Sequence, residues 1–300
     1  RLDRVHARVG FVVATPEGGG LHGFIDYTAH RIVDQIETMD YASAEEVPCR
    51  MIFTLADDNV GLLPQLSTIP LATIATRMRQ SGWEGFSTRH WLIGDLDPTV
   101  QYLAHSSWDA SISPSTAFAD LAAAVCNSQG TEPLIEAWNL IEQVGAGFSK
   151  YGLGYGFPTV RMMTKHWEGA EANPRVGDCL SEAILADRDR FARALELAQE
   201  AAGHAWPAGK QFVDYLIGRL VFGVRYIDTT EAVLKAGIAE RSGQRETAIT
   251  ELHTAMAMIR EAIQAYADVA ADNSDRGAVA ILNENSYRRI RDILKELTET

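Results

Sequence analysis

The sequence predicts an α/β part with three βα units over residues 1–110 and an all-helical part over residues 111–300. Two observations predict this division. Up to about residue 110, short apolar runs of strand length alternate with helical patterns, which is typical of a parallel sheet or barrel with helices on its outside. From about residue 115 onwards, almost every segment has the apolar spacing of an amphipathic helix.

The α/β part begins with two short strands separated by a helix. The first predicted strand is Val9–Ala14, and a glycine-rich loop leads from it to a helix from about Tyr27 to Met39. The second strand, Arg50–Ala56, is apolar without alternation, as expected when both faces of a parallel sheet are buried. Together they predict a first βαβ unit.

A second helix and a third strand continue this pattern. Ser67 or Thr68 can cap the helix, which ends near residue 82. The third strand, Gly85–Trp91, ends in large functional side chains, and Asp97-Pro98 then supplies the cap and first-turn proline of another helix. The spacing is close to the ~30 residues expected for each βα repeat.

The helical part is expected to be a packed set of long helices that supports the α/β part. Ser113-Pro114 and Thr131-Glu132-Pro133 mark two helix starts, and an irregular stretch over 145–179 is long enough to be a functional loop or lid. Further helices are predicted over about 180–202, 208–240, 245–271 and 277–298. One of them carries a packing stripe: Ile249, Leu252, Met256, Ile259, Ile263 and Tyr266. These late helices show no catalytic cluster, so any activity is expected from the first 170 residues.

The composition restricts the possible partners. The net charge is −13, and the absence of a basic run argues against nucleic acid as a partner. No stretch reaches the roughly 18 apolar residues of a membrane span. Cys49, Cys126 and Cys179 match no metal or redox spacing and are expected to be buried thiols. The chain starts at Arg1 without a signal peptide, which suggests a processed chain or a fragment and leaves compartment and oligomeric state open.

Asp57, Asp58 and Asn59 form the first candidate cluster, directly after the second predicted strand. A carboxylate at this position can act as general acid or base, or can anchor a sugar hydroxyl. Neighbouring residues at a strand end point in opposite directions, so one or two of the three can reach a shared cavity. The alternative is that an aspartate caps the following turn and Asn59 takes a left-handed conformation.

Arg89, His90 and Trp91 form the second candidate cluster, at the end of the third strand. A tryptophan face stacks well on the apolar face of a sugar ring, and Arg89 or His90 can bind a carboxylate or hydroxyl. Only alternate residues face inward along a strand. The alternative is a structural tryptophan packed on the next helix beside a hydrogen-bonded histidine.

Two loops supply the remaining candidates. Glu17 follows the first strand among glycines that allow close backbone approach to a ligand, although a flexible surface loop explains the same residues. Tyr151, Tyr155 and Trp167 lie in the aromatic, glycine-rich stretch over 148–167, which is expected to form a mobile wall over a pocket or to pack against the helices. Histidine spacing indicates no metal site, and we expect neither a metal nor an organic cofactor.

The segment Met51–Trp108 resembles the last two βα units of glycoside-hydrolase (β/α)8 barrels of the hexosaminidase-like and α-glucuronidase-like kind. The resemblance rests on a strand ending in polar residues, the GLLPQL loop, the GWEG turn, a strand with an aromatic end, and the DLDPTVQYLAHSSWDASISP sequence that leads into a helical domain. It implies a partial (β/α)8-type barrel, with the last three βα units preceding a C-terminal helical domain. In that case the main acid and base carboxylates would lie on earlier units, and the residues after the second and third predicted strands would bind or support the substrate. The paired Asp/Glu signature of hexosaminidases does not occur in the sequence.

The sequence therefore predicts a glycoside hydrolase, or the C-terminal portion of one, whose partner is a carbohydrate substrate. The catalytic candidates are the carboxylates Asp57, Asp58 and Glu17, and the other named polar and aromatic residues are expected to bind the sugar. The alternative is a non-enzymatic helical interaction protein with a structural α/β cap. That alternative predicts an exposed apolar or acidic groove along the helices over 208–271.

Overall fold

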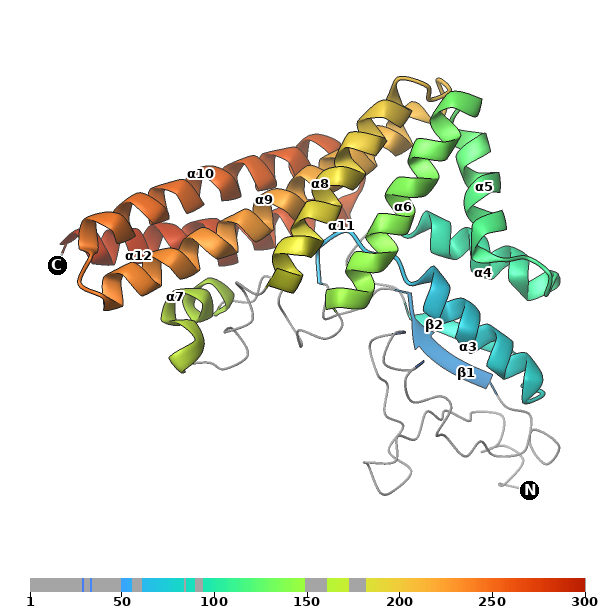
Figure 1. The fold of residues 1–300 in the computed structure, drawn as a ribbon, viewed down its shortest axis with the longest axis horizontal. Coiled ribbons are helices and arrows are strands. Elements are labelled where there is room, and N and C mark those ends of the chain that lie inside the picture. Colours follow the sequence, from blue (N-terminus) through green and yellow to red (C-terminus); the bar gives the residue numbers. More distant parts are fainter. Residues whose placement is uncertain are drawn as a thin grey trace.

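The fold is mostly helical, with one small parallel sheet of two strands (Figure 1). The computed structural model describes residues 29, 33, 50–55, 61–83, 85–89, 94–148, 161–172 and 182–299. The predicted strand Val9–Ala14 lies outside these residues. Ala29 and Val33 are helical, as predicted for the segment that contains them. The described residues form a strand–helix–strand unit and a large helical part, and they do not form a closed barrel.

The strand–helix–strand unit confirms two of the predicted strands and the helix between them. Strand β1 (Arg50–Thr54) pairs in parallel with β2 (Gly85–Arg89), and helix α3 (Thr68–Gln80) connects them. The rings of Phe53 and Phe86 stack with their centroids 5.1 Å apart, which fixes the two strands side by side. Because the strands are parallel, both carboxyl ends meet at one edge of the sheet.

The two helices that follow the strands start next to each other. Helix α4 (Asp97–Trp108) begins at Asp97, so this residue lies in the first turn and is not the N-cap that its position predicted. The N-cap residue is Leu96, whose side chain cannot accept a hydrogen bond. The hydroxyls of Thr68 and Thr99 lie 2.8 Å apart and join the first turns of α3 and α4.

Helix α5 (Pro114–Val125) begins as predicted, with the hydroxyl of Ser113 accepting a hydrogen bond from the Thr116 amide. Helix α6 (Ser128–Phe148) starts earlier than predicted and contains Pro133 within it. The reason is Asn127, whose side-chain oxygen accepts from the Gln129 amide and so caps the helix about one turn before the predicted start at Thr131.

The predicted irregular stretch over 145–179 is partly helical. Helix α6 continues to Phe148, and helix α7 (Met162–Ala172) lies within the stretch. The rest of the stretch lies outside the described residues. Helix α7 packs on a later long helix, and this burial of one face gives a short amphipathic segment enough tertiary contact to be helical.

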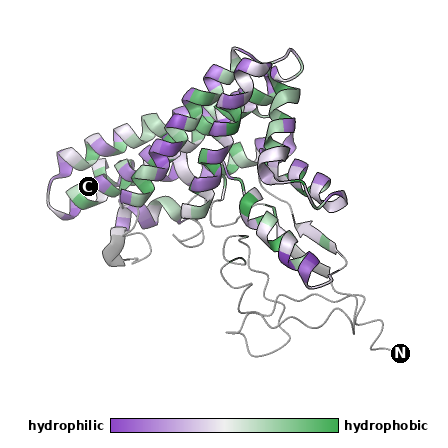
Figure 2. Ribbon diagram, turned by 45° about the vertical axis from the view of Figure 1, so that its right-hand side comes forward, coloured by the Kyte–Doolittle hydropathy of each residue, from purple (hydrophilic) through white to green (hydrophobic). Residues whose placement is uncertain are grey.

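The remaining helices form an elongated bundle (Figure 1). They are α8 (Glu182–Ala202), α9 (Lys210–Arg241), α10 (Arg245–Val269), α11 (Asn273–Leu282), the π-helical turn η3 (Asn283–Tyr287) and α12 (Arg288–Glu299). The predicted last helix is therefore interrupted by a π-turn. The stripe on α10 is confirmed as a packing face, because Leu252, Ile259 and Tyr266 are fully buried. Figure 2 shows hydrophobic and hydrophilic residues on the same helices, as amphipathic packing requires.

One hydrophobic core runs from Phe53 of β1 to Leu297 of α12. The loop over 61–66 joins the sheet to the bundle, because Leu62, Leu63 and Leu66 are buried in this core. No helix of the described segments is long and apolar enough to cross a membrane. The loop after β1 is thus one part of the strand–helix–strand unit that is buried with the long helices.

Candidate functional site

The carboxyl edge of the sheet is the site that the sequence predicted. Thr54 and Arg89 are opposite each other in the register, so the chain leaves both strands at the same level. Arg89 is the last residue of β2. Most of the predicted site residues lie outside the described residues: Glu17, Asp57, Asp58, Asn59, His90, Trp91, Tyr151 and Tyr155. The structure does describe residues 61–67, which follow the first candidate cluster, and residues 94–96, which follow the second. Both of these stretches contact a buried charged side chain.

This buried charged side chain is Arg219 of α9. It is fully buried, and its Nη2 donates to the carbonyl oxygen of Leu62 at 2.5 Å. Its Nε lies 3.4 Å from Oδ2 of Asp95, which is also buried. One guanidinium group therefore contacts the loop after β1 and the loop after β2.

Aromatic rings cover the guanidinium. Its carbon lies 4.2 Å from the ring centroid of Tyr266 and 5.3 Å from that of Phe222, distances at which a cation is attracted to the ring face. Burial raises the pKa of Asp95, and the charge of Arg219 acts in the opposite direction. Arg219 Nη1 and Asp95 Oδ1 are buried without a hydrogen-bond partner in the described chain.

Asp275 of α11 completes what we call the Arg219 cluster, consisting of Asp95, Tyr215, Arg219, Tyr266 and Asp275. Both tyrosine hydroxyls donate to Asp275 Oδ1, at 2.8 Å from Tyr215 and 3.0 Å from Tyr266. The Ala271 amide donates to Asp275 Oδ2. Burial raises the pKa of both tyrosines, so they stay protonated as donors. The cluster is a buried polar network that is largely satisfied, which makes it rigid.

Glu142 of α6 is a second buried carboxyl near this edge, and the sequence analysis did not identify it. Its Oε1 accepts from the Thr68 amide at 2.6 Å, so Glu142 caps α3, while Ser67 makes no side-chain cap bond. Burial raises the pKa of Glu142 to about 7, against the opposing effect of the hydrogen bonds from Thr68 and Ile69. The two capping partners lie 74 residues apart in sequence, so no local pattern could reveal the contact.

Trp167 is a predicted site residue that the structure describes, and it lies away from the carboxyl edge of the sheet. Its carbonyl oxygen accepts from Nη1 of Arg241 at 2.6 Å and lies against Gly237 of α9. Gly237 follows Arg219 by 18 residues on the same helix, which is about 27 Å at about 1.5 Å per residue. The adjacent His166 is buried, and burial together with the nearby Lys165 charge lowers its pKa to about 4. The structure thus places α7 far along α9 from the sheet edge (Figure 1).

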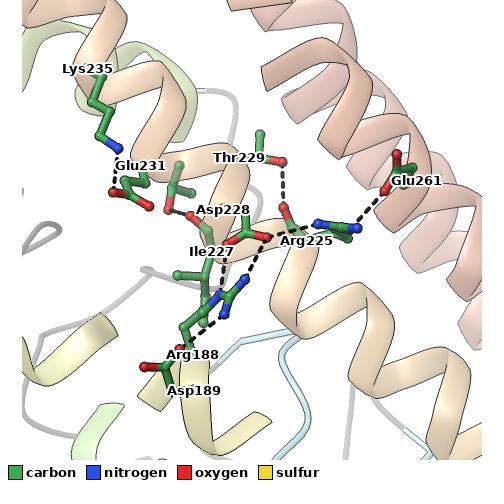
Figure 3. A network of polar contacts seen from close by, with 10 residues as sticks. Arg188, Asp189, Arg225, Ile227, Asp228, Thr229, Glu231, Lys235 and Glu261 are labelled. Atoms are coloured by element: carbon green, nitrogen blue, oxygen red, sulfur yellow. Dashed lines mark hydrogen bonds and ion pairs between the residues drawn. The ribbon is translucent and has the colours of Figure 1, made fainter. Parts of the chain in front are cut away.

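A further set of ion pairs lies between these two ends of α9 (Figure 3). Asp228 binds Arg188 of α8 at 3.0 Å and Arg225 at 3.3 Å, and Arg225 also binds Glu261 of α10 at 2.8 Å. Arg225 is 40% exposed and Glu261 57% exposed. The Arg225–Glu261 pair is exposed enough to contribute little to stability, whereas Asp228 is 11% exposed and the pair of Arg219 with Asp95 is buried on both sides.

Metal-binding chemistry has no candidate among the residues that the structure describes. In them, no three side chains of His, Cys, Asp or Glu are grouped so that they could hold an ion. Cys126 is a free, buried thiol, as predicted. Cys49 and Cys179 lie outside the described residues.

Comparison of the chain with protein-family models, with curated proteins and with solved structures gives no match. Any function must therefore be argued from the site itself. The site consists of the carboxyl edge of the parallel strands and the two segments that follow it, with buried Glu142 of α6 and Arg219 of α9 in contact with the chain beyond them.

Proposed function

We propose that this chain is a glycoside hydrolase, or the carbohydrate-binding portion of one, with its sugar site at the carboxyl edge of β1 and β2. The observation that carries the proposal is the parallel register that sets Thr54 opposite Arg89. Because of it, the segments that begin after Leu55 and at Arg89 start from one edge of the sheet. In α/β proteins with parallel strands, this edge is where ligands bind.

The proposal gives each candidate a role. Asp57 or Asp58 supplies the carboxylate that protonates the leaving oxygen or activates water. Trp91 stacks on the sugar ring, and hydrogen bonds to its hydroxyls come from Asn59, Arg89 and His90. The strand–helix–strand unit is, in this proposal, part of a (β/α)8-type barrel, in which helices after consecutive strands start side by side as α3 and α4 do.

Glu17, Tyr151 and Tyr155 complete the proposed site. Glu17 supplies a further carboxylate from the loop after the first predicted strand. The two tyrosines belong to the wall over the sugar. Trp167 is left out of this site, because its backbone packs against the opposite half of α9.

The test is sugar binding and turnover by the 300-residue chain. A panel of nitrophenyl glycosides and nitrophenyl uronides measures hydrolysis, and calorimetry with N-acetylglucosamine and methyl glucuronide measures binding. We expect Asp58→Asn and Trp91→Ala to weaken or abolish both signals, and Trp108→Ala to leave them unchanged, because Trp108 is 94% exposed on α4. A folded wild-type chain that neither binds nor hydrolyses any member of the panel would contradict the proposal.

A helical interaction protein remains the second candidate, and one observation favours it. A hollow of about 770 Å³ lies along α9, α10 and η3, with Val221 and Ile263 in its lining beside Arg225, Arg260 and Tyr287. The position agrees with the groove that this alternative predicts, although the charges in its lining have both signs. Substitution of Ile263 by Glu separates the two candidates, since it leaves sugar binding unchanged if the sheet edge is the site.

A further inference from the structure

We propose that Arg219 is a positioning residue for the sugar-binding edge, and that it holds the segments after β1 and β2 at a fixed separation. This inference rests on the proposed function for its consequence in sugar binding. The geometry that carries it is independent of any ligand. It consists of one guanidinium group bound to two loops.

The two contacts of Arg219 lie close in sequence to the two candidate clusters. Arg219 binds the carbonyl oxygen of Leu62 and the carboxylate of Asp95. Leu62 follows Asn59 by three residues, and Asp95 follows Trp91 by four. Arg219 therefore contacts the chain three residues after the first candidate cluster and four residues after the second.

The side chain of Arg219 has little conformational freedom. It is fully buried, and its guanidinium lies against the rings of Tyr266 and Phe222. One turn later on α9, a Cβ at Gly223 would lie 3.0 Å from Cδ of Pro64, so the loop over 61–66 approaches the helix closely. A rigid helix with a planar, multidentate donor group holds two loops more precisely than a single hydrogen bond would.

The pair of Arg219 with Asp95 could instead serve only to stabilise the fold. A buried ion pair is a poor source of stability, because apolar side chains of similar volume often do as well or better. Arg219 Nη1 and Asp95 Oδ1 also have no hydrogen-bond partner in the described chain, which adds a desolvation cost. The geometry that Arg219 imposes on the two loops therefore explains its position better than a gain in stability does.

The experiment compares Arg219→Lys with Arg225→Lys by hydrogen exchange. Lysine keeps the charge but replaces Nη2 and Nε, the two nitrogens of Arg219 that contact the two loops, with one ammonium nitrogen that lacks the planar fork. We expect the peptides over 55–66 and 88–97 to exchange about tenfold faster in Arg219→Lys, the effect of losing one hydrogen bond to a charged group. The matched control, Arg225→Lys, changes a 40% exposed arginine on the same helix (Figure 3) and should leave both peptides unchanged.

Asp95→Asn is the second variant, in case Arg219→Lys does not fold. It weakens the contact of Arg219 with the loop after β2 and keeps the bond to Leu62. We expect faster exchange over 88–97 with little change over 55–66. Equal acceleration of both peptides, or of neither, in this variant would overturn the assignment of one contact to each loop.

Sugar affinity gives the readout that a merely structural role would not change. If the melting temperature of Arg219→Lys stays within a few degrees of wild type, affinity for the sugars that the wild type binds should still fall about tenfold. Unchanged exchange, or unchanged affinity in a chain that binds sugar, overturns the positioning role. Absence of sugar binding by the wild type overturns the proposed function instead, so the two failures are distinguishable.

Discussion

The N-terminal half of α9 contains the buried pair of Arg219 with Asp95, whereas the C-terminal half meets α7 through a glycine and a backbone carbonyl. Arg219 binds Leu62 and Asp95 in the first half. In the second half, Gly237 lets the Trp167 carbonyl approach the helix, and Arg241 binds that carbonyl. Close packing and a hydrogen bond from Arg241 to a backbone carbonyl, without a buried ion pair, dock α7 there. Buried charge is costly, so its concentration next to the sheet edge indicates a region where geometry matters beyond stability.

The largest expected effect comes from removing the partner of Arg219. Asp95→Ala leaves the guanidinium buried without its carboxylate, and we expect the free energy of unfolding to fall by about 3–5 kcal/mol. Chemical denaturation measures this loss. Asp214→Ala is the control, because its pair with Lys210 is exposed and should contribute less than about 1 kcal/mol. Similar losses in the two variants would remove the distinction between buried and exposed charge.

The C-terminal half of α9 is tested by Gly237→Ala. The added methyl group would overlap the Trp167 carbonyl, and we expect a loss of about 1–3 kcal/mol with faster hydrogen exchange in α7. The control is Gly277→Ala in α11, where the methyl group meets nothing within 4 Å and alanine should stabilise the helix by roughly 0.5–1 kcal/mol. Sugar binding should be unchanged in both variants. A loss of sugar binding in Gly237→Ala alone would assign α7 to the site.

The raised pKa of Glu142 should make the free energy of unfolding depend on pH. Its pKa is about 7 in the folded chain and is raised above the usual value of 4.5, so the folded state loses stability as the pH rises from 4.5 through 7. Glu142→Gln cannot ionise, and we expect it to be more stable than wild type at pH 8 by roughly 1–3 kcal/mol and equal to it near pH 4.5. Denaturation at both pH values measures this. Glu136→Gln, an exposed position on the same helix, should show no such difference, and a parallel pH profile for Glu142→Gln and wild type would contradict the assignment.

Local patterns predicted the two described strands and most of the helices, but not α7, which lies in the stretch predicted to be irregular. Apolar runs and capping residues locate β1, β2 and α5, because those signals depend on near neighbours in sequence. Helix α6 starts before its predicted proline, since the Asn127 cap is a competing local signal. The barrel, the domain boundary near residue 110 and the site roles of the candidate residues stay predictions.

The buried groups behind the site could not be predicted from the sequence. Glu142 caps a helix 74 residues away, and Arg219 binds Asp95 across 124 residues. Each looks like an ordinary charged residue of an amphipathic helix, and only the packing of that helix decides that the side chain is buried. Asp275 likewise looks like a helix-start aspartate, although its carboxylate binds two tyrosines.

The most direct test of the central claim is the change in tryptophan fluorescence when a sugar binds. The chain has six tryptophans, and the proposed site contains one of them, Trp91. Titration with N-acetylglucosamine and with methyl glucuronide should change the emission of wild type and of Trp108→Phe. The same titration should give no change in Trp91→Phe. A signal that persists in Trp91→Phe and disappears in Trp167→Phe would contradict the account and place the sugar at the opposite half of α9.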